Sequence, residues 1–245
     1  MVRSIDLNCD LGEGAGHDRE LMPLVTSVNI ACGGHAGDEA SMGEALDLAH
    51  AAGVEAGAHP SYVDRANFGR TELEIPPAQI KREVEAQIRA LAALGTISHV
   101  KPHGALYNRA ARDPEVAKAV IAAILSVNPK LALFGLSGSY LVRKARAAGL
   151  RVVSEVFADR TYQPDGSLTP RSQPNALISD TRTCLAQAIR FATDRKVRAV
   201  DGEDITVLAD TICLHGDGDH AVEFAQAIRA GLQQVGIRVV AARKR

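Results

Sequence analysis

The chain has 245 residues, with 28 Lys and Arg against 29 Asp and Glu, and 46% of its residues are hydrophobic. α/β barrels of roughly 200–250 residues commonly form one domain with a large core and no disulfides. The net charge of −1 argues against nucleic-acid binding, because neutralising phosphates requires a basic excess. Aromatic residues make up only 4%, with no Trp, which disfavours stacking platforms for bases or sugars.

The cysteines and the N-terminal residues favour a reduced, cytoplasmic protein. No two cysteines have the CxxC spacing of a zinc ribbon or a thioredoxin-like motif. The segment MVRSIDLNCDLG lacks the apolar core of a signal peptide, and no window approaches 18 apolar residues, so we expect no membrane span. We expect Cys9, Cys32 and Cys213 to be small buried hydrophobes rather than nucleophiles, because none has a fixed adjacent base.

Short apolar runs alternate with helical patterns along the whole chain. The runs are Ser4–Cys9, Ser27–Cys32, Val54–Ala58, Ile97–Lys101, Leu131–Gly135, Arg151–Phe157, Thr211–Leu214 and Ile237–Ala241. Each has the length and composition of a strand buried on both faces. The alternation predicts right-handed crossovers and a parallel sheet. Seven or eight such units favour a closed parallel β/α barrel over an open doubly wound sheet, as a single domain over residues 1–245.

The helices between these runs have recognisable ends. An Asp or Ser before the helix predicts an N-cap, a Pro predicts the first turn, and a Gly predicts the end. The predicted helices cover residues 39–52, 77–94, 114–127, 139–148, 181–193 and 221–235, with Asp38, Asp113, Asp180 and Asp219 as caps.

Two segments depart from the alternation. Residues 197–208 read as a β-hairpin with a two-residue turn at Asp201-Gly202. Residues 159–175 hold three prolines and little periodicity. A loop this long in a compact chain is typical of a functional lid, although the same segment could be a docking surface for a partner.

Four of the eight histidines follow predicted strands. They are His35, His59, His103 and His215, and Gly or Pro flanks each one. The carboxyl ends of parallel barrel strands open on one face, where such folds build active sites. A single histidine at such a position is usually a hydrogen-bonded core or turn residue. Four together are harder to explain in that way.

Other polar residues lie at the same strand ends and extend the predicted site. Lys101 ends an apolar run, where an unpaired ammonium would be costly to bury, so it requires a carboxylate or a ligand anion. The remaining candidates are Asn8, Asp10, Glu155, Asp159, Arg160 and Asp217. Imidazoles with carboxylates can also hold Zn²⁺ or Mn²⁺, but the chain has no HxH or HExxH pair, so a divalent metal remains an open alternative.

Six motifs, in order along nearly the whole chain, resemble the LamB/YcsF family. They are DLNCDLGEGAG (6–16), NIACGGHAGD (29–38), GAHPSYVDRANFGR (57–70), VKPHGALYN (100–108), EVFADRTYQPDGSLTPR (155–171) and ICLHGD (212–217). Two positions depart from the family pattern, which usually has Phe at Gly34 and Pro at Val63. We expect Gly34 to remove an aromatic wall beside His35 and to alter the shape of the pocket.

The resemblance implies a distorted β/α barrel similar to polysaccharide deacetylases. It also implies ATP-dependent opening of 5-oxo-L-proline to L-glutamate, in a complex with the B and C subunits of a 5-oxoprolinase. The chain has no GK[ST] phosphate loop, so partners could bind the ATP wholly or partly. Two alternatives are a metal-dependent deacetylase or amidohydrolase of an N-acyl substrate, and a non-catalytic subunit that binds a small acid.

A lactam is a poor electrophile, so its hydrolysis needs a base, an acid for the leaving nitrogen and stabilisation of the oxyanion. We assign the base to Asp10 or Asp217 and the acid to His103 or His215. Lys101 and Arg160 would hold a carboxylate or phosphate. His35 and His59 would complete a substrate pocket together with Asn8, Glu155 and Asp159.

Overall fold

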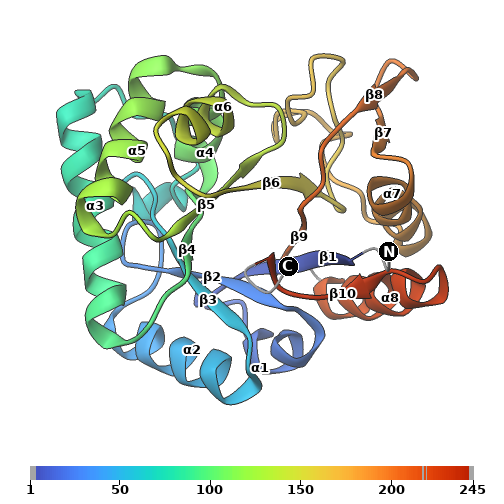
Figure 1. The fold of residues 1–245 in the computed structure, drawn as a ribbon, viewed down its shortest axis with the longest axis horizontal. Coiled ribbons are helices and arrows are strands. Elements are labelled where there is room, and N and C mark those ends of the chain that lie inside the picture. Colours follow the sequence, from blue (N-terminus) through green and yellow to red (C-terminus); the bar gives the residue numbers. More distant parts are fainter. Residues whose placement is uncertain (1–3, 217, 219, 243–245) are drawn as a thin grey trace.

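Seven parallel strands close into a barrel in the computed structural model, which describes residues 4–216, 218 and 220–242 (Figure 1). In order they are β1 (Ser4–Leu11), β2 (Ser27–Ala31), β3 (Glu55–His59), β4 (His99–Val100), β5 (Ala132–Leu136), β6 (Val152–Phe157) and β9 (Thr211–His215). The barrel closes because β9 pairs with β6 on one edge and with β1 on the other. The predicted parallel β/α barrel is confirmed, with seven strands.

The last predicted run does not form an eighth barrel strand. β10 (Arg238–Val239) pairs only with Ser4 and Ile5, at the start of β1. The same edge of β1 pairs with β2 from Asn8 onward. β10 therefore fills the part of this edge that β2 does not reach.

Helices surround the barrel, and the predicted N-caps form. They are α1 (Asp18–Leu21), α2 (Glu39–Ala52), α3 (Pro77–Leu94), α4 (Gly104–Arg112), α5 (Pro114–Val127), α6 (Tyr140–Ala147), α7 (Thr181–Thr193) and α8 (Ala221–Gln234), with 3-10 turns η1 (Met22–Leu24) and η2 (Arg65–Asn67). The side chains of Asp38, Asp113 and Asp180 accept hydrogen bonds from backbone N–H groups in the first turns of α2, α5 and α7, respectively. The predicted cap Asp219 lies outside the described residues. Among those described, no helix combines the length and apolarity that a membrane crossing needs.

Helix α4 was not predicted from the sequence. It begins directly after the short loop that follows β4. Its N-cap is His103, whose side chain makes no capping hydrogen bond, so the usual local signal is absent. This helix brings Tyr107 under the candidate site.

The predicted hairpin forms, but its two-residue turn is wrong. β7 (Lys196–Arg198) and β8 (Asp204–Thr206) are antiparallel, and the ladder ends at the pair Arg198–Asp204. Ala199 N donates to Glu203 O at 2.8 Å, and Gly202 N donates to Ala199 O at 3.0 Å. The hydrogen bond between Ala199 and Glu203 encloses three residues, 200–202, which is one more than the predicted two. Gly202 takes the left-handed conformation (φ 89°) that a three-residue loop requires.

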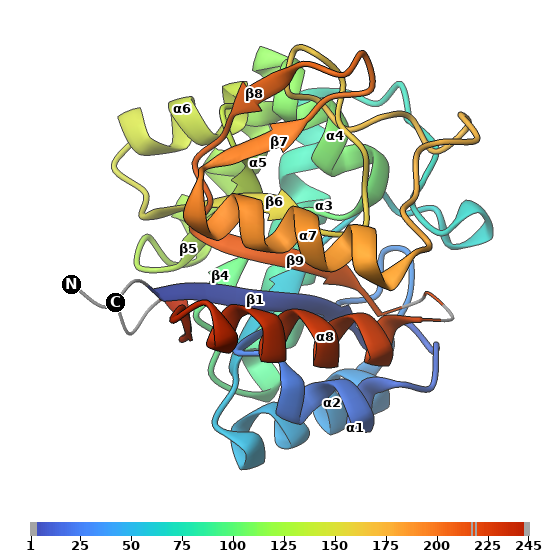
Figure 2. The ribbon, with the colours of Figure 1, turned by 90° about the vertical axis from the view of Figure 1, so that its right-hand side faces the viewer.

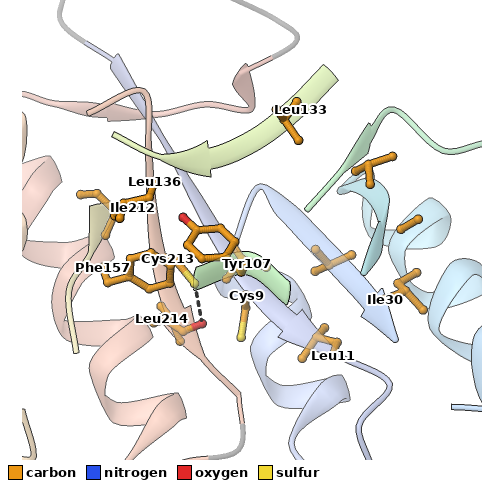
Figure 3. Close-up of a cluster of buried hydrophobic side chains, with 14 of the residues drawn as sticks. Cys9, Leu11, Ile30, Tyr107, Leu133, Leu136, Phe157, Ile212, Cys213 and Leu214 are labelled. Atoms are coloured by element: carbon orange, nitrogen blue, oxygen red, sulfur yellow. Dashed lines mark hydrogen bonds between the residues drawn. The ribbon is translucent and has the colours of Figure 1, made fainter. Parts of the chain in front are cut away.

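The apolar core lies between the strands and the helices, whereas the barrel interior is polar. Figure 3 shows members of the apolar cluster, including Leu11, Ile30, Leu133 and Ile212 from four strands. Along β1, Asp6, Asn8 and Asp10 alternate with apolar residues and hydrogen-bond to neighbouring strands. Figure 2 shows α7 and α8 side by side across the outside of β9 and β1, with the hairpin beyond α7.

Candidate active site

A cavity of about 330 Å³ opens at the carboxyl ends of the barrel strands. Asp10 on β1, His59 on β3, Lys101 after β4 and His215 on β9 line it together with His103. The structure thus brings together at one rim side chains from strands far apart in the sequence. Parallel closure of the barrel places these carboxyl ends on one face.

Lys101 is paired within the protein. Its Nζ lies 2.8 Å from Asp10 Oδ1, 3.0 Å from Glu155 Oε1 and 3.0 Å from Cys213 Sγ. Burial alone would lower the pKa of Lys101, but Asp10, Cys213 and Glu155 hold it well above its usual range. Burial alone would raise the pKa of Asp10, but His59 and Lys101 hold it well below its usual range. Asp10 and Glu155 therefore supply the carboxylate that Lys101 was expected to require.

Asn8 and Glu155 lie beneath the cavity and do not line it. Both are fully buried, and Asn8 Nδ2 donates to Glu155 Oε1 at 2.9 Å. Tyr107 OH donates to Glu155 Oε2 at 2.8 Å, and Asn29 Nδ2 donates to Asn8 Oδ1 at 2.8 Å. Asn8 and Glu155 were predicted to bind substrate. In the structure they belong instead to a hydrogen-bonded layer beneath the cavity, and this layer supports the residues of the cavity floor, Asp10 and Lys101.

Glu13 is a site residue that the sequence analysis missed. Its Oε1 lies 2.9 Å from His35 Nε2 and 3.4 Å from His103 Nδ1. Gly12 and Gly14 on either side of it have left-handed φ values of 74° and 81°, which bend the loop after β1 toward the histidines. The Gly-x-Gly spacing is visible in the sequence, but it does not mark the carboxylate between the glycines as a site residue.

The three histidines beside Glu13 form one buried cluster. The rings of His35 and His103 stack in parallel with centroids 3.7 Å apart, and His59 Nε2 lies 3.0 Å from His103 Nδ1. His35 does not line the cavity, so it lies behind His103. Burial lowers the pKa of His35 to about 4 and, with the neighbouring His59 and His35, lowers the pKa of His103 well below its usual range.

Backbone carbonyls orient two of these rings. His59 Nδ1 lies 2.7 Å from Lys101 O, and His103 Nε2 lies 3.0 Å from Phe68 O. A carbonyl oxygen only accepts hydrogen bonds, so both of these ring nitrogens carry a hydrogen. The other nitrogen of each ring faces the carboxylates.

His215 and Asp159 form a second pair at the rim. His215 Nδ1 lies 2.8 Å from Asp159 Oδ2, which also accepts the backbone N–H of His215 at 2.9 Å. Burial alone would raise the pKa of Asp159, but His215 lowers it below its usual range. Asp217, the other predicted acidic residue here, lies outside the described residues.

Arg160 lines the cavity, but part of its guanidinium anchors the loop after β6. Nε donates to Ala176 O at 3.2 Å and Nη2 to Thr169 O at 2.6 Å. Burial, with the nearby charge of Arg171, lowers the pKa of Arg160 to about 10. Arg70 and Arg171 also line the cavity, although the sequence analysis did not single them out. The segment 159–175, expected to be either a lid or a docking surface, contributes Arg160, Pro170 and Arg171 to one wall of the cavity.

Gly34 does not shape the cavity as expected. A Cβ at this position would lie 2.4 Å from both Ser61 Oγ and Gln87 Oε1. Gln87 on α3 bonds both backbone groups of Ser61, accepting from its N at 3.0 Å and donating to its O at 2.8 Å. The space in which an aromatic wall was expected is filled by this contact, and Gly34 is not among the lining residues.

All four cysteines are buried and free of disulfides. Burial raises the pKa of Cys9 and Cys213 well above the usual range. Neither thiol therefore has the low pKa that a cysteine nucleophile requires.

Comparison with known proteins places this geometry among related chains. Residues 5–245 match the LamB/YcsF family. A protein from Brevibacillus brevis, named as the A subunit of 5-oxoprolinase, is 50% identical over 250 residues, which cover 98% of each chain. The crystal structure of a lactam utilization protein from Thermus thermophilus is 44% identical, with a TM-score of 0.90, and the match covers 97% of this chain and 99% of that one. A family 4 carbohydrate esterase from Streptomyces lividans is 13% identical with a TM-score of 0.51 over 98% of this chain and 94% of that one, a likeness of fold alone.

Proposed function

Because the chain belongs to the LamB/YcsF family, we propose that it is a subunit of an ATP-dependent 5-oxoprolinase, which opens the lactam of 5-oxo-L-proline to L-glutamate. The observation that carries the proposal is the cavity of about 330 Å³ at the barrel rim. Its size suits a small acid, and its wall combines arginines with His215, which is paired with Asp159.

The reaction needs activation as well as proton transfer. ATP phosphorylates the amide oxygen, water adds to the carbon, and the C–N bond breaks as the nitrogen takes a proton. A second water then releases phosphate from the resulting acyl phosphate. Positioned acids and bases contribute roughly 10²–10⁴-fold to such steps.

We assign proton transfer to His215. Asp159 accepts from its Nδ1, so the ring is oriented with Nε2 as the exchanging nitrogen. A carboxylate behind a histidine fixes its tautomer and stabilises its protonated form. His215 can therefore take a proton from water and deliver one to the leaving ring nitrogen.

The arginines of the wall line the cavity, where they can hold an anion. Lys101 contacts Asp10, Glu155 and Cys213, so its charge serves to neutralise buried carboxylates. Arg70 and Arg171 line the cavity and can bind the substrate carboxylate or a phosphate through their planar guanidinium groups. This revises the roles that the sequence suggested for Lys101 and, in part, for Arg160.

The nucleotide and the partners complete the proposal. The chain has no GK[ST] phosphate loop, so we assign ATP binding wholly or partly to the B and C subunits of the complex. A lactam activated on one subunit can then react at the barrel rim of this one.

The test is an assay of 5-oxoproline-dependent ATP hydrolysis and glutamate release with the chain and the B and C subunits, together and singly. We expect turnover only in the full mixture and a loss of at least about 10²-fold with His215→Ala or Asp159→Asn. His220→Ala is the matched control, because its side chain is 53% exposed and pairs with nearby Glu223.

Two outcomes would overturn the proposal. One is a complete mixture whose ATP hydrolysis does not respond to 5-oxoproline or to the presence of this chain. The other is ATP-independent hydrolysis of an N-acyl substrate by the isolated chain, which would favour an amidohydrolase. Full turnover by His215→Ala would remove the assigned role of His215 while leaving the overall activity in place.

A further inference from the structure

Two imidazole nitrogens, His59 Nε2 and His103 Nδ1, face each other at the floor of the cavity. The carbonyl of Lys101 accepts a hydrogen bond from His59 Nδ1 at 2.7 Å, and the carbonyl of Phe68 accepts one from His103 Nε2 at 3.0 Å. In the neutral rings, His59 Nε2 and His103 Nδ1 are therefore both lone-pair atoms. They lie 3.0 Å apart, a distance at which two lone pairs repel unless a positive species lies beside them.

Two carboxylates converge on the same nitrogens. Glu13 Oε1 lies 3.4 Å from His103 Nδ1 and 3.9 Å from His59 Nε2. Asp10 Oδ2 lies 3.3 Å from His59 Nε2. The side chains of all four residues are at most 6% exposed, so water does not supply the missing donors freely. Each of these four buried side chains thus places an atom that can bind a cation within 3.9 Å of another such atom.

The charge of the floor points the same way. Its buried ionisable groups include three carboxylates, on Asp10, Glu13 and Glu155, and one ammonium, on Lys101. Carboxylates outnumber the ammonium by two within this set, and a divalent cation suits such an excess of buried carboxylates.

We propose that Glu13, His59, His103 and Asp10 bind one divalent transition-metal ion. Ligand atoms bonded to zinc at about 2.0–2.2 Å in a tetrahedron lie about 3.3 Å from one another. The spacings of 3.0, 3.3, 3.4 and 3.9 Å among these four residues surround that value. Two imidazoles with two carboxylates suit Zn²⁺, Mn²⁺ or Fe²⁺.

His35 acts as a positioning residue for this site. Its ring is stacked in parallel on His103 with centroids 3.7 Å apart. Its Nε2 lies 2.9 Å from Glu13 Oε1 and can donate a hydrogen bond that fixes the carboxylate. The carbonyls of Lys101 and Phe68 orient the two imidazole ligands in the same way.

The proposed ion would face the cavity. Asp10, His59 and His103 all line it, so the side of the site away from the protein ligands is open to a bound molecule. Four protein ligands fill a tetrahedral site, so a molecule bound from this side would take a fifth coordination position, an expansion that catalytic zinc sites can make. Its use for a substrate oxygen or a water rests on the proposed function, whereas the binding of the ion does not.

The test is metal binding by the isolated full-length chain, without ATP or partners. After chelator treatment and dialysis, titration calorimetry with Zn²⁺ and Mn²⁺ should show one saturable site per chain, and Co²⁺ should give a ligand-field absorption spectrum. We expect His103→Gln and Glu13→Gln to weaken binding by at least tenfold. His17→Gln is the matched control, because that histidine pairs with Glu20 on the surface.

Variants are compared only where circular dichroism shows a native fold, and His59→Gln replaces either variant that fails this criterion. His35→Gln should lower metal affinity about 10–100-fold while leaving the melting temperature of the metal-free chain unchanged.

Failure of the wild-type chain to bind any of the three ions, or equal binding by folded His103→Gln, would overturn the proposal in favour of a single proton shared by the two rings. An active complex that holds no metal would leave the proposed function standing and still reject this site.

Discussion

The Nζ atom of Lys101 lies 2.8 Å from Oδ1 of Asp10, and both side chains are buried inside the barrel. This contact joins β1 to the residue that follows β4, across the barrel interior. It neutralises one of the carboxylates at the cavity floor and leaves Asp10 Oδ2 directed toward His59. The lysine therefore organises the floor of the cavity.

Lys101→Met should lower the free energy of unfolding by about 3–5 kcal/mol, because it leaves Asp10 and Glu155 buried without their cation. Urea denaturation in the presence of chelator measures this. Lys118→Met is the control, since Lys118 and its partner Glu115 are 65% and 62% exposed and such a pair contributes at most about 1 kcal/mol. Equal losses in the two variants would contradict the assigned role.

Gly34→Ala should destabilise the protein by about 1–3 kcal/mol, because the added Cβ would overlap Ser61 Oγ and Gln87 Oε1. Gly43→Ala provides a control of opposite sign. Gly43 lies in α2 with open space around it, so alanine there should add up to about 1 kcal/mol of stability. Thermal denaturation of both variants decides the matter, and a neutral Gly34→Ala would show that Gln87 moves aside easily.

His99 should make the protein less stable in acid. Its ring is buried, with Nε2 2.9 Å from Asn29 Oδ1 and a stacking contact with Phe134. Burial, with the charge of Lys101, lowers its pKa from 6.5 to about 3. Between these pH values the unfolded chain binds the proton and the folded chain does not. Stability is therefore lost as the pH falls from 6.5 toward 3, by up to about 1.4 kcal/mol per pH unit.

His99→Gln removes this titration while keeping a donor for Asn29. Urea denaturation between pH 6.5 and 4 should show a shallower dependence on pH for the variant, whatever its absolute stability. His220→Gln controls for the loss of an exposed imidazole. An unchanged slope in His99→Gln would mean that other groups cause the acid sensitivity.

Arg160→Ala should loosen the loop after β6, because it removes the contacts with Thr169 O and Ala176 O. Hydrogen exchange of the amides of residues 169–178 should become at least about tenfold faster, since local opening becomes less costly. Arg19→Ala, which removes an exposed pair with Glu44, should leave these amides unchanged. Exchange in Arg160→Ala that is as slow as in the wild-type chain would show that the backbone β-bridges at Tyr162 and Leu177 hold the loop without the arginine side chain.

Much of the architecture followed from local patterns. The caps at Asp38, Asp113 and Asp180 were predictable because each side chain bonds a backbone group two or three residues further on. The placement of His59, His103 and His215 at one rim was predictable because parallel strands end on one face. Helix α4 was not predicted because the residue before it, His103, makes no side-chain capping hydrogen bond. The predicted turn of the hairpin was one residue too short.

The sequence alone determined the barrel, the helix ends and the face on which the polar residues gather, because hydrophobic periodicity and capping act over a few residues. The tertiary structure decided which of those residues meet. Glu13 reaches His35 and His103, which lie 22 and 90 positions further along the chain, and Gly34, in the loop after β2, is enclosed by Gln87 on α3. Contacts across such separations depend on how the strands close and the loops fold back, and no local pattern encodes them.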